Sequence, residues 1–85
     1  MAKVTVYTAG KCCYCHMAKT LLRRKDAAFE EIDLTGQPEK RRSLSERAGG
    51  RQTVPQIWIG ERHVGGCDDL YALDREGKLD ALLAR

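Results

Sequence analysis

The fold of this chain is decided by residues 3–25, KVTVYTAGKCCYCHMAKTLLRRK. Valines alternate with other residues over Lys3–Thr8, and this period of two predicts a β-strand. After a short turn, apolar residues at helical spacing predict a helix from Tyr14 to about Lys25. The segment is therefore a strand followed by a helix, with a Cys-x-x-Cys motif at residues 12–15 where the two meet.

The position of this motif indicates thiol–disulfide chemistry. Cys12 and Cys15 are three residues apart, so they lie one above the other in a first helical turn, within reach of a disulfide. The positive end of the helix dipole favours a thiolate at that point. A Cys12–Cys13 disulfide would be strained, because adjacent Cα atoms lie about 3.8 Å apart and most disulfides need roughly 4.4–6.8 Å. We therefore expect Cys12 and Cys15 to form the redox pair.

The rest of the chain extends this beginning into a mixed sheet. A second strand after the first helix is far enough along the chain to pair in parallel with the first. A tight turn at Gly60-Glu61 predicts an antiparallel hairpin. The expected elements are strands at Phe29–Leu34, Gln56–Ile59 and Arg62–Val64, a helix at Glu39–Ala48, a helix with Asp68 and Asp69 in its first turn that ends near Gly77, and a short docking helix at Leu79–Leu83. The order β-α-β-α-β-β-α predicts helices packed on a four-stranded mixed sheet, an α/β fold.

Length and composition narrow the setting. The 85 residues predict one domain, residues 1–85. The first residues lack the basic start and long apolar run expected of a signal peptide, and no apolar stretch is long enough to predict a membrane span. We expect a cytoplasmic protein. Three of the four cysteines crowd into residues 12–15, which argues against a secreted disulfide scaffold. The net charge is +3, but no aromatic residues lie among the basic clusters. We therefore expect no nucleic-acid binding.

Three motifs in order give the chain a family resemblance. Tyr7-Thr8 precedes Cys12-x-x-Cys15-His16, Thr53-Val54-Pro55-Gln56 follows, and Gly65-Gly66-Cys67-Asp68-Asp69-Leu70 comes near the end. With these motifs the chain resembles a glutaredoxin of the small bacterial dithiol class, over nearly its whole length. The resemblance implies a thioredoxin-like fold, a cis peptide bond before Pro55, and glutathione-dependent reduction of glutathione mixed disulfides and protein disulfides.

The resemblance also implies a glutathione site. Backbone groups near Val54 would pair with the cysteinyl part of glutathione, and the helix start at Cys67-Asp68 would hold the γ-glutamyl end. Helix capping is the simpler explanation for Asp68 and Asp69, and capping can coexist with ligand binding. The lysine that commonly contacts the glycyl carboxylate has Lys11 as its nearest counterpart, with Arg51 and Arg42 as possible replacements. The expected glutathione-binding residues are Lys11, Tyr14, Arg51, Thr53, Val54, Pro55, Gly66, Cys67 and Asp68.

The same resemblance suggests a reaction cycle. Cys12, nearest the helix start, would attack a glutathionylated substrate, and free glutathione would then release the Cys12–glutathione mixed disulfide. Cys15 would resolve mixed disulfides formed with proteins. Expected partners are glutathione and glutathionylated or disulfide-containing proteins, ribonucleotide reductase among them, and we expect a monomer that needs no metal. Cys13 stands where the family commonly has proline, which adds a backbone N–H near the Cys12 sulfur.

Two alternatives use the cysteines differently. Cys12, Cys15, His63 and Cys67 match the ligand types of a structural zinc site. A [2Fe-2S] cluster bridging two chains through Cys12 and glutathione is the other alternative, since some family members that lack the motif proline form one. If thioredoxin reductase, and not glutathione, reduced the oxidised protein, this result would favour a thioredoxin-like enzyme.

Overall fold

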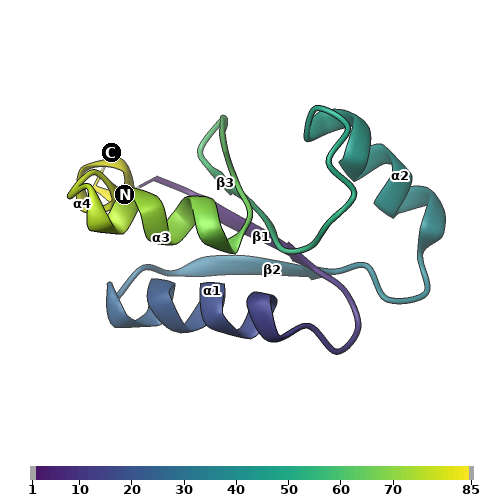
Figure 1. The fold of residues 1–85 in the computed structure, drawn as a ribbon, viewed down its shortest axis with the longest axis horizontal. Helices are drawn as coiled ribbons and strands as arrows, with labels where there is room; N and C mark the ends of the chain where they lie inside the picture. Colours follow the sequence, from purple (N-terminus) through teal and green to yellow (C-terminus); the bar gives the residue numbers. More distant parts are fainter. Residues whose placement is uncertain (1, 85) are drawn as a thin grey trace.

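The computed structural model describes residues 2–84, which form the elements that the sequence predicts. The elements are β1 Val4–Thr8, α1 Cys13–Arg24, β2 Phe29–Asp33, α2 Pro38–Arg47, β3 Gln56–Ile59, β4 Arg62–Gly65, α3 Cys67–Arg75 and α4 Leu79–Leu83 (Figure 1). Two helices begin one residue before the expected position. In α1 the side chain of Cys12 caps the helix, and in α2 Pro38 occupies the first turn, where a missing N–H costs nothing.

The strands form one four-stranded mixed sheet in the order β2-β1-β3-β4. β1 pairs in parallel with β2, while β3 lies antiparallel to both β1 and β4. The predicted mixed sheet is therefore confirmed. In the registers, Tyr7 near the end of β1 lies opposite Gln56 at the start of β3, and Ile57 lies opposite Gly65 at the end of β4.

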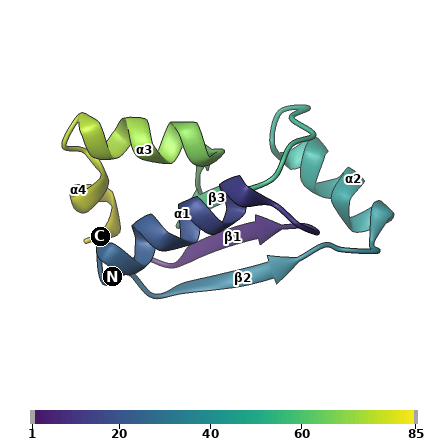
Figure 2. The same ribbon diagram turned by 60° about the horizontal axis from the view of Figure 1, so that its bottom comes forward.

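One face of the sheet carries α1 and α3 (Figure 2). Ala18, Leu21 and Leu22 of α1 are at most 1% exposed, as expected for an apolar stripe at helical spacing. They pack with Val4 and Val6 of the sheet, and with α3 and α4, in the larger hydrophobic core. Deleting one of these buried leucine side chains would cost about 2–5 kcal/mol, so this core holds the site-bearing helices in place.

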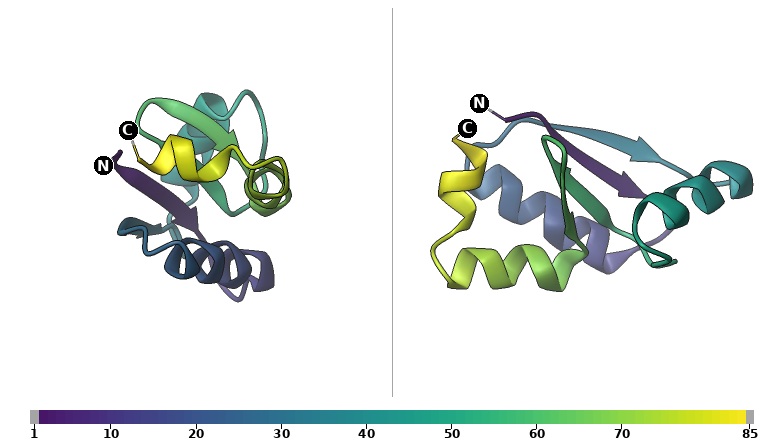
Figure 3. Two further views of the ribbon diagram at one scale, coloured as in Figure 1. Left: turned by 90° about the vertical axis from the view of Figure 1, so that its left-hand side faces the viewer. Right: turned by 90° about the horizontal axis from the view of Figure 1, so that it is seen from above.

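The opposite face of the sheet has a smaller core beneath α2. Leu44 of this polar helix and Ala48, which directly follows it, pack with Leu34 and with Trp58 of β3. Figure 1 and the right-hand view of Figure 3 show α2 near the carboxyl ends of β1 and β2, apart from α1 and α3. Within residues 2–84, no helix has the length and apolar character that crossing a bilayer requires.

The topology brings three connections between elements to one end of the sheet. α1 begins just after β1, the loop before β3 lies beside the end of β1, and α3 begins just after β4. Figure 2 shows the first turns of α1 and α3 at this same end. The motifs at residues 12–15, 53–56 and 65–70 are therefore neighbours in space, although about forty residues separate the first two in sequence.

Candidate active site

Cys12 is the capping residue of α1 and lies half-buried at the meeting point of these motifs. Its extended backbone (φ −124°, ψ 109°) turns the sulfur back over the helix, where Sγ accepts the N–H of Cys15 at 3.2 Å. The thiol itself donates to the carbonyl of Val54, at 3.5 Å. A capping sulfur that accepts a helix N–H is well suited to carry negative charge.

Cys15 has the opposite environment. It is 4% exposed, and burial followed by the hydrogen bond to Cys12 raises the pKa of its thiol to about 12. Cys15 is therefore a thiol at neutral pH and cannot compete as a nucleophile. All four cysteines lie within the described part of the chain and are free thiols, with Cys13 exposed.

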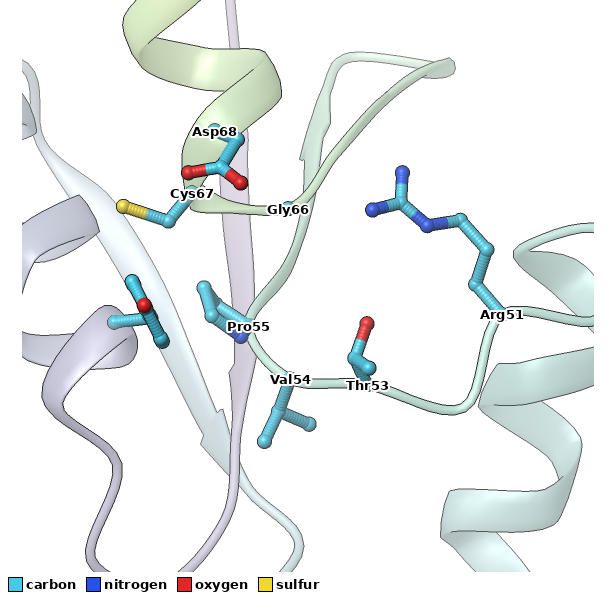
Figure 4. Close-up of a pocket in the computed structure, with 8 residues that line it drawn as sticks. Arg51, Thr53, Val54, Pro55, Gly66, Cys67 and Asp68 are labelled. Carbon is cyan, nitrogen blue, oxygen red and sulfur yellow. The ribbon is translucent and has the colours of Figure 1, made fainter.

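A pocket of about 350 Å³ (Figure 4) is lined in part by Val54, whose carbonyl accepts from the Cys12 thiol. One side is the loop before β3, and the other is the start of α3. Its lining residues are Tyr14, Arg51, Thr53, Val54, Pro55, Gly66, Cys67 and Asp68. The structure thus brings together eight of the nine residues that the sequence predicts for the ligand site. The peptide bond between Val54 and Pro55 is cis, as the resemblance implies.

The ninth residue, Lys11, is not part of this pocket. It lines a separate cavity of about 510 Å³ together with Ala9, Gly10 and the segment 34–38. Arg42, the other replacement considered, lines a third cavity that α2 forms with Gln52. Of the candidate cations, only Arg51 faces the predicted site among the described residues.

The two aspartates at the start of α3 have different surroundings. Asp69 Oδ2 accepts the N–H of Gly66 at 2.8 Å and pairs with Nη1 of Arg51, also at 2.8 Å. The Arg51 hydrogen bond, followed by that of Gly66, holds the pKa of the Asp69 carboxyl below its ordinary value. Asp68 instead is exposed and lines the pocket. The capping role therefore belongs to Asp69, and Asp68 lines the pocket.

Gly65 is required by the Arg51–Asp69 pair. Its φ of +117° is a conformation that residues with a side chain rarely adopt. A Cβ at this position would also collide with the Asp69 carboxylate and lie 2.6 Å from Nη1 of Arg51. The absence of a side chain at Gly65 thus lets the Arg51–Asp69 ion pair lie close to the backbone.

Cys67 forms part of the pocket surface and is 5% exposed. Burial raises the pKa of its thiol, and the nearby charges of Asp68 and Cys12 raise it further. Cys67 therefore presents an uncharged side chain to the pocket at neutral pH. In residues 2–84, no three Cys, His, Asp or Glu side chains come together as metal ligands. The zinc set of Cys12, Cys15, His63 and Cys67 is thus not assembled.

Two residues that support the pocket were missed in the sequence. The side-chain amide of Gln56 donates to the Thr53 carbonyl at 3.0 Å, and its oxygen lies 2.8 Å from Nε2 of His63. Burial, followed by the charge of Arg51, lowers the pKa of His63. The available signal was a glutamine opening the otherwise apolar strand Gln56–Ile59, whose four residues are all buried.

Comparison with known proteins gives a consistent result. Residues 4–64 match the family model described as glutaredoxin. A glutaredoxin of Pseudomonas aeruginosa is 60% identical over 84 residues, covering 99% of each chain. Glutaredoxin 3 of Escherichia coli K12 is 53% identical over 83 residues, covering 98% of this chain and 99% of its own length.

Solved structures agree with this result. A buckwheat glutaredoxin, solved as a complex with glutathione, superposes with a TM-score of 0.90 at 31% identity, covering 98% of this chain and 77% of that one. The thioredoxin-like fold implied by the resemblance is thereby confirmed. From the family match, these relatives and the close placement of Cys12 and Cys15, we conclude that this chain belongs to the glutaredoxin family of thiol–disulfide oxidoreductases.

Proposed function

We propose that the pocket beside Cys12 holds the glutathionyl group of a mixed disulfide while Cys12 attacks its sulfur. The observation that carries this proposal is the contact of Cys12 Sγ with the Val54 carbonyl, 3.5 Å away, because Val54 also lines the pocket. A ligand seated along the loop of residues 53–55 therefore has its sulfur next to the nucleophile.

The charges around the pocket match the chemistry of glutathione. This tripeptide has a central cysteine, a carboxylate at each end, and an ammonium group beside the γ-glutamyl carboxylate. The start of α3 offers backbone N–H groups without helical partners, which bind a carboxylate, and Asp68 can accept from the ammonium group. Arg51 also lines the pocket, and we assign the glycyl carboxylate to its guanidinium, which pairs with Asp69 as well. The buckwheat relative, solved with glutathione, supports glutathione as the ligand.

In the first step, the Cys12 thiolate attacks the glutathione sulfur of the substrate. A Cys12–glutathione disulfide forms, the substrate disulfide breaks, and the substrate leaves as a thiolate that takes up a proton. The N–H of Cys15, 3.2 Å from Cys12 Sγ, stabilises the attacking thiolate. The glutathionyl group then occupies the pocket.

In the second step, a glutathione thiolate attacks the pocket-bound glutathione sulfur. Glutathione disulfide is released with Cys12 as a thiolate, so one free glutathione thiol is consumed and the second sulfur of the product comes from the substrate's glutathionyl group. For a protein disulfide, Cys12 first forms a mixed disulfide with the protein, and Cys15 then attacks the Cys12 sulfur. The Cys12–protein bond breaks, the protein leaves as a thiolate, and two glutathione thiols reduce the resulting Cys12–Cys15 disulfide. For this attack Cys15 must lose its proton. The negative charge of Cys12 is one of the effects that raise the Cys15 pKa, and this charge is absent once Cys12 is in the mixed disulfide.

Two cysteine variants test this function. With a glutathionylated peptide as substrate, we expect Cys12→Ser to lose activity by about a thousandfold or more, since a serine hydroxyl is not ionised at neutral pH. Cys15→Ser should reduce the same peptide within a few-fold of the wild-type rate, yet fail on a protein disulfide. Turnover of the glutathionylated peptide by Cys12→Ser would contradict the assignment of the nucleophile.

A further inference from the structure

Gln56 is a fully buried polar side chain in a strand of otherwise apolar residues. It is 0% exposed and opens β3 beside Tyr7 of β1. A buried amide costs free energy unless its hydrogen bonds are made, whereas an apolar side chain of similar size avoids that cost. Its presence therefore indicates a role beyond filling space.

The hydrogen bonds of Gln56 show what it holds. Its Nε2 donates to the Thr53 carbonyl at 3.0 Å and lies 3.3 Å from the Thr53 hydroxyl. A carbonyl can only accept, so the amide nitrogen must face Thr53 and the amide oxygen must face His63. The His63 Nε2, 2.8 Å from that oxygen, is consequently the donor.

His63 is itself fixed against the sheet. Its ring stacks on Trp58 with centroids 4.4 Å apart and an angle of 27°. The Arg47 guanidinium lies 4.9 Å from the Trp58 ring centroid, and Tyr7 meets this ring edge-on. A continuous series of contacts thus runs from the sheet through His63 and Gln56 to the pocket loop.

At the end of this series lies the Thr53 hydroxyl. Because it can accept from Gln56, its own O–H remains available as a donor. Figure 4 shows this hydroxyl projecting toward the space between Arg51 and Gly66. We propose that Gln56 and His63 are positioning residues, which act through Thr53 to direct its hydroxyl at a carboxylate of the bound glutathionyl group. This inference rests on the proposed function of the pocket.

A double-mutant cycle tests the proposal. KM and kcat are measured for a glutathionylated peptide with wild type, Gln56→Met, Thr53→Val and the double variant. We expect each single change to raise KM about five- to tenfold with kcat within twofold, and the double variant to be no worse than the more affected single one. Fully additive effects, or an unchanged KM in folded Gln56→Met, would overturn the proposal.

A second variant keeps the test independent of the buried position. His63→Phe retains a ring to stack on Trp58 and removes the N–H that Gln56 accepts. KM should rise about two- to fivefold, and His63→Gln, which can restore a donor, should recover part of the loss. An unchanged KM in His63→Phe would remove His63 from the proposal.

Two controls separate this proposal from the function of the pocket. Gln37 also donates its side-chain amide to a backbone carbonyl at 3.0 Å, that of Asp33, but away from the pocket. Gln37→Met should therefore leave KM unchanged. If Asp68→Asn raises KM and Gln56→Met does not, the pocket function stands and the positioning role fails. If neither variant changes KM, the pocket assignment itself fails.

Discussion

Cys12 lies between two surfaces that are built very differently. The pocket wall, residues 51–55 and 65–69, is held by the Arg51–Asp69 pair and by the hydrogen bonds of Gln56. The open wall, residues 9–11 and 34–38, is mostly exposed, with one hydrogen bond between its two segments, from the Gly10 N–H to the Thr35 hydroxyl at 2.7 Å. A fixed wall suits one ligand of defined charge, whereas an open wall suits partners that vary. In the proposed cycle glutathione is the constant ligand, and the protein substrates differ.

The largest expected effect concerns the alkylation rate of buried Cys15, compared with that of exposed Cys13. Since burial raises the pKa of Cys15 to about 12, its thiolate fraction at pH 7 is about a thousandfold or more below that of an ordinary cysteine. Iodoacetamide should therefore alkylate Cys15 in the reduced native protein at least a thousandfold more slowly than in guanidinium, as mass spectrometry can follow. The native rate should increase as the pH rises toward 12. Native labelling of Cys15 as fast as that of exposed Cys13 would contradict the buried placement.

A glycine pair compares the two walls directly. Gly65 in the pocket wall and Gly36 in the open wall both have positive φ, +117° and +72°, but only at Gly65 would a Cβ meet other atoms within 4 Å. We expect Gly36→Ala to lower the free energy of unfolding by about 1 kcal/mol from backbone strain alone. Gly65→Ala should lower it by about 3 kcal/mol, because it adds a collision with the Arg51–Asp69 pair. Equal losses in urea denaturation would show that the pocket wall is not tightly packed.

A third test removes one charge from each wall. Asp68→Asn should raise KM for a glutathionylated peptide about tenfold, since it removes a charged acceptor for the ligand ammonium group. Lys11→Gln should change KM less than twofold, because Lys11 lies in the separate cavity. A larger rise in KM for Lys11→Gln than for Asp68→Asn would indicate that the ligand binds at the open wall.

The smallest expected effect is the acid sensitivity of the Arg51–Asp69 pair. Arg51 lowers the pKa of Asp69, so the pair stabilises the fold above the unfolded carboxyl pKa of about 4, and this stability is lost as the pH falls through the lower folded value. Both side chains are 44% exposed, which limits the contribution to about 1 kcal/mol or less. Asp69→Asn should therefore unfold more easily than wild type at pH 7, and this difference should shrink below pH 4. A difference that grows in acid would contradict the pairing.

The sequence was sufficient for features that depend on local patterns. Alternation at Val4 and Val6 predicted β1, and the apolar spacing of Ala18, Leu21 and Leu22 predicted α1. Cys12 was expected at the helix start, where the structure has it as the capping residue. The pocket residues were expected from three motifs taken together, since no single motif specifies a ligand. The cis peptide bond followed from the family resemblance alone.

Features that depend on long-range contacts could not be predicted. Arg51 meets Asp69 across 18 residues, and no local pattern reveals that a Cβ on Gly65 would strike this pair. The choice between Lys11 and Arg51 depended on the path of two loops, and only Arg51 reaches the pocket. In the sequence, Gln56 was only the last residue of a motif. Its role depends on hydrogen bonds to Thr53, in the loop before β3, and to His63 in β4, which the fold brings together.

The central claim is that the glutathionyl group on Cys12 lies against the pocket wall. The most direct measurement compares ¹H–¹⁵N NMR spectra of Cys15→Ser before and after it forms a mixed disulfide with glutathione. We expect the largest amide shifts at Thr53, Val54 and residues 66–68, with intermolecular nuclear Overhauser effects from Val54 to the ligand. Residues 9–11 and 34–37 should change little. The largest shifts and Overhauser contacts at the open wall, with Val54 and Asp68 unchanged, would contradict the claim.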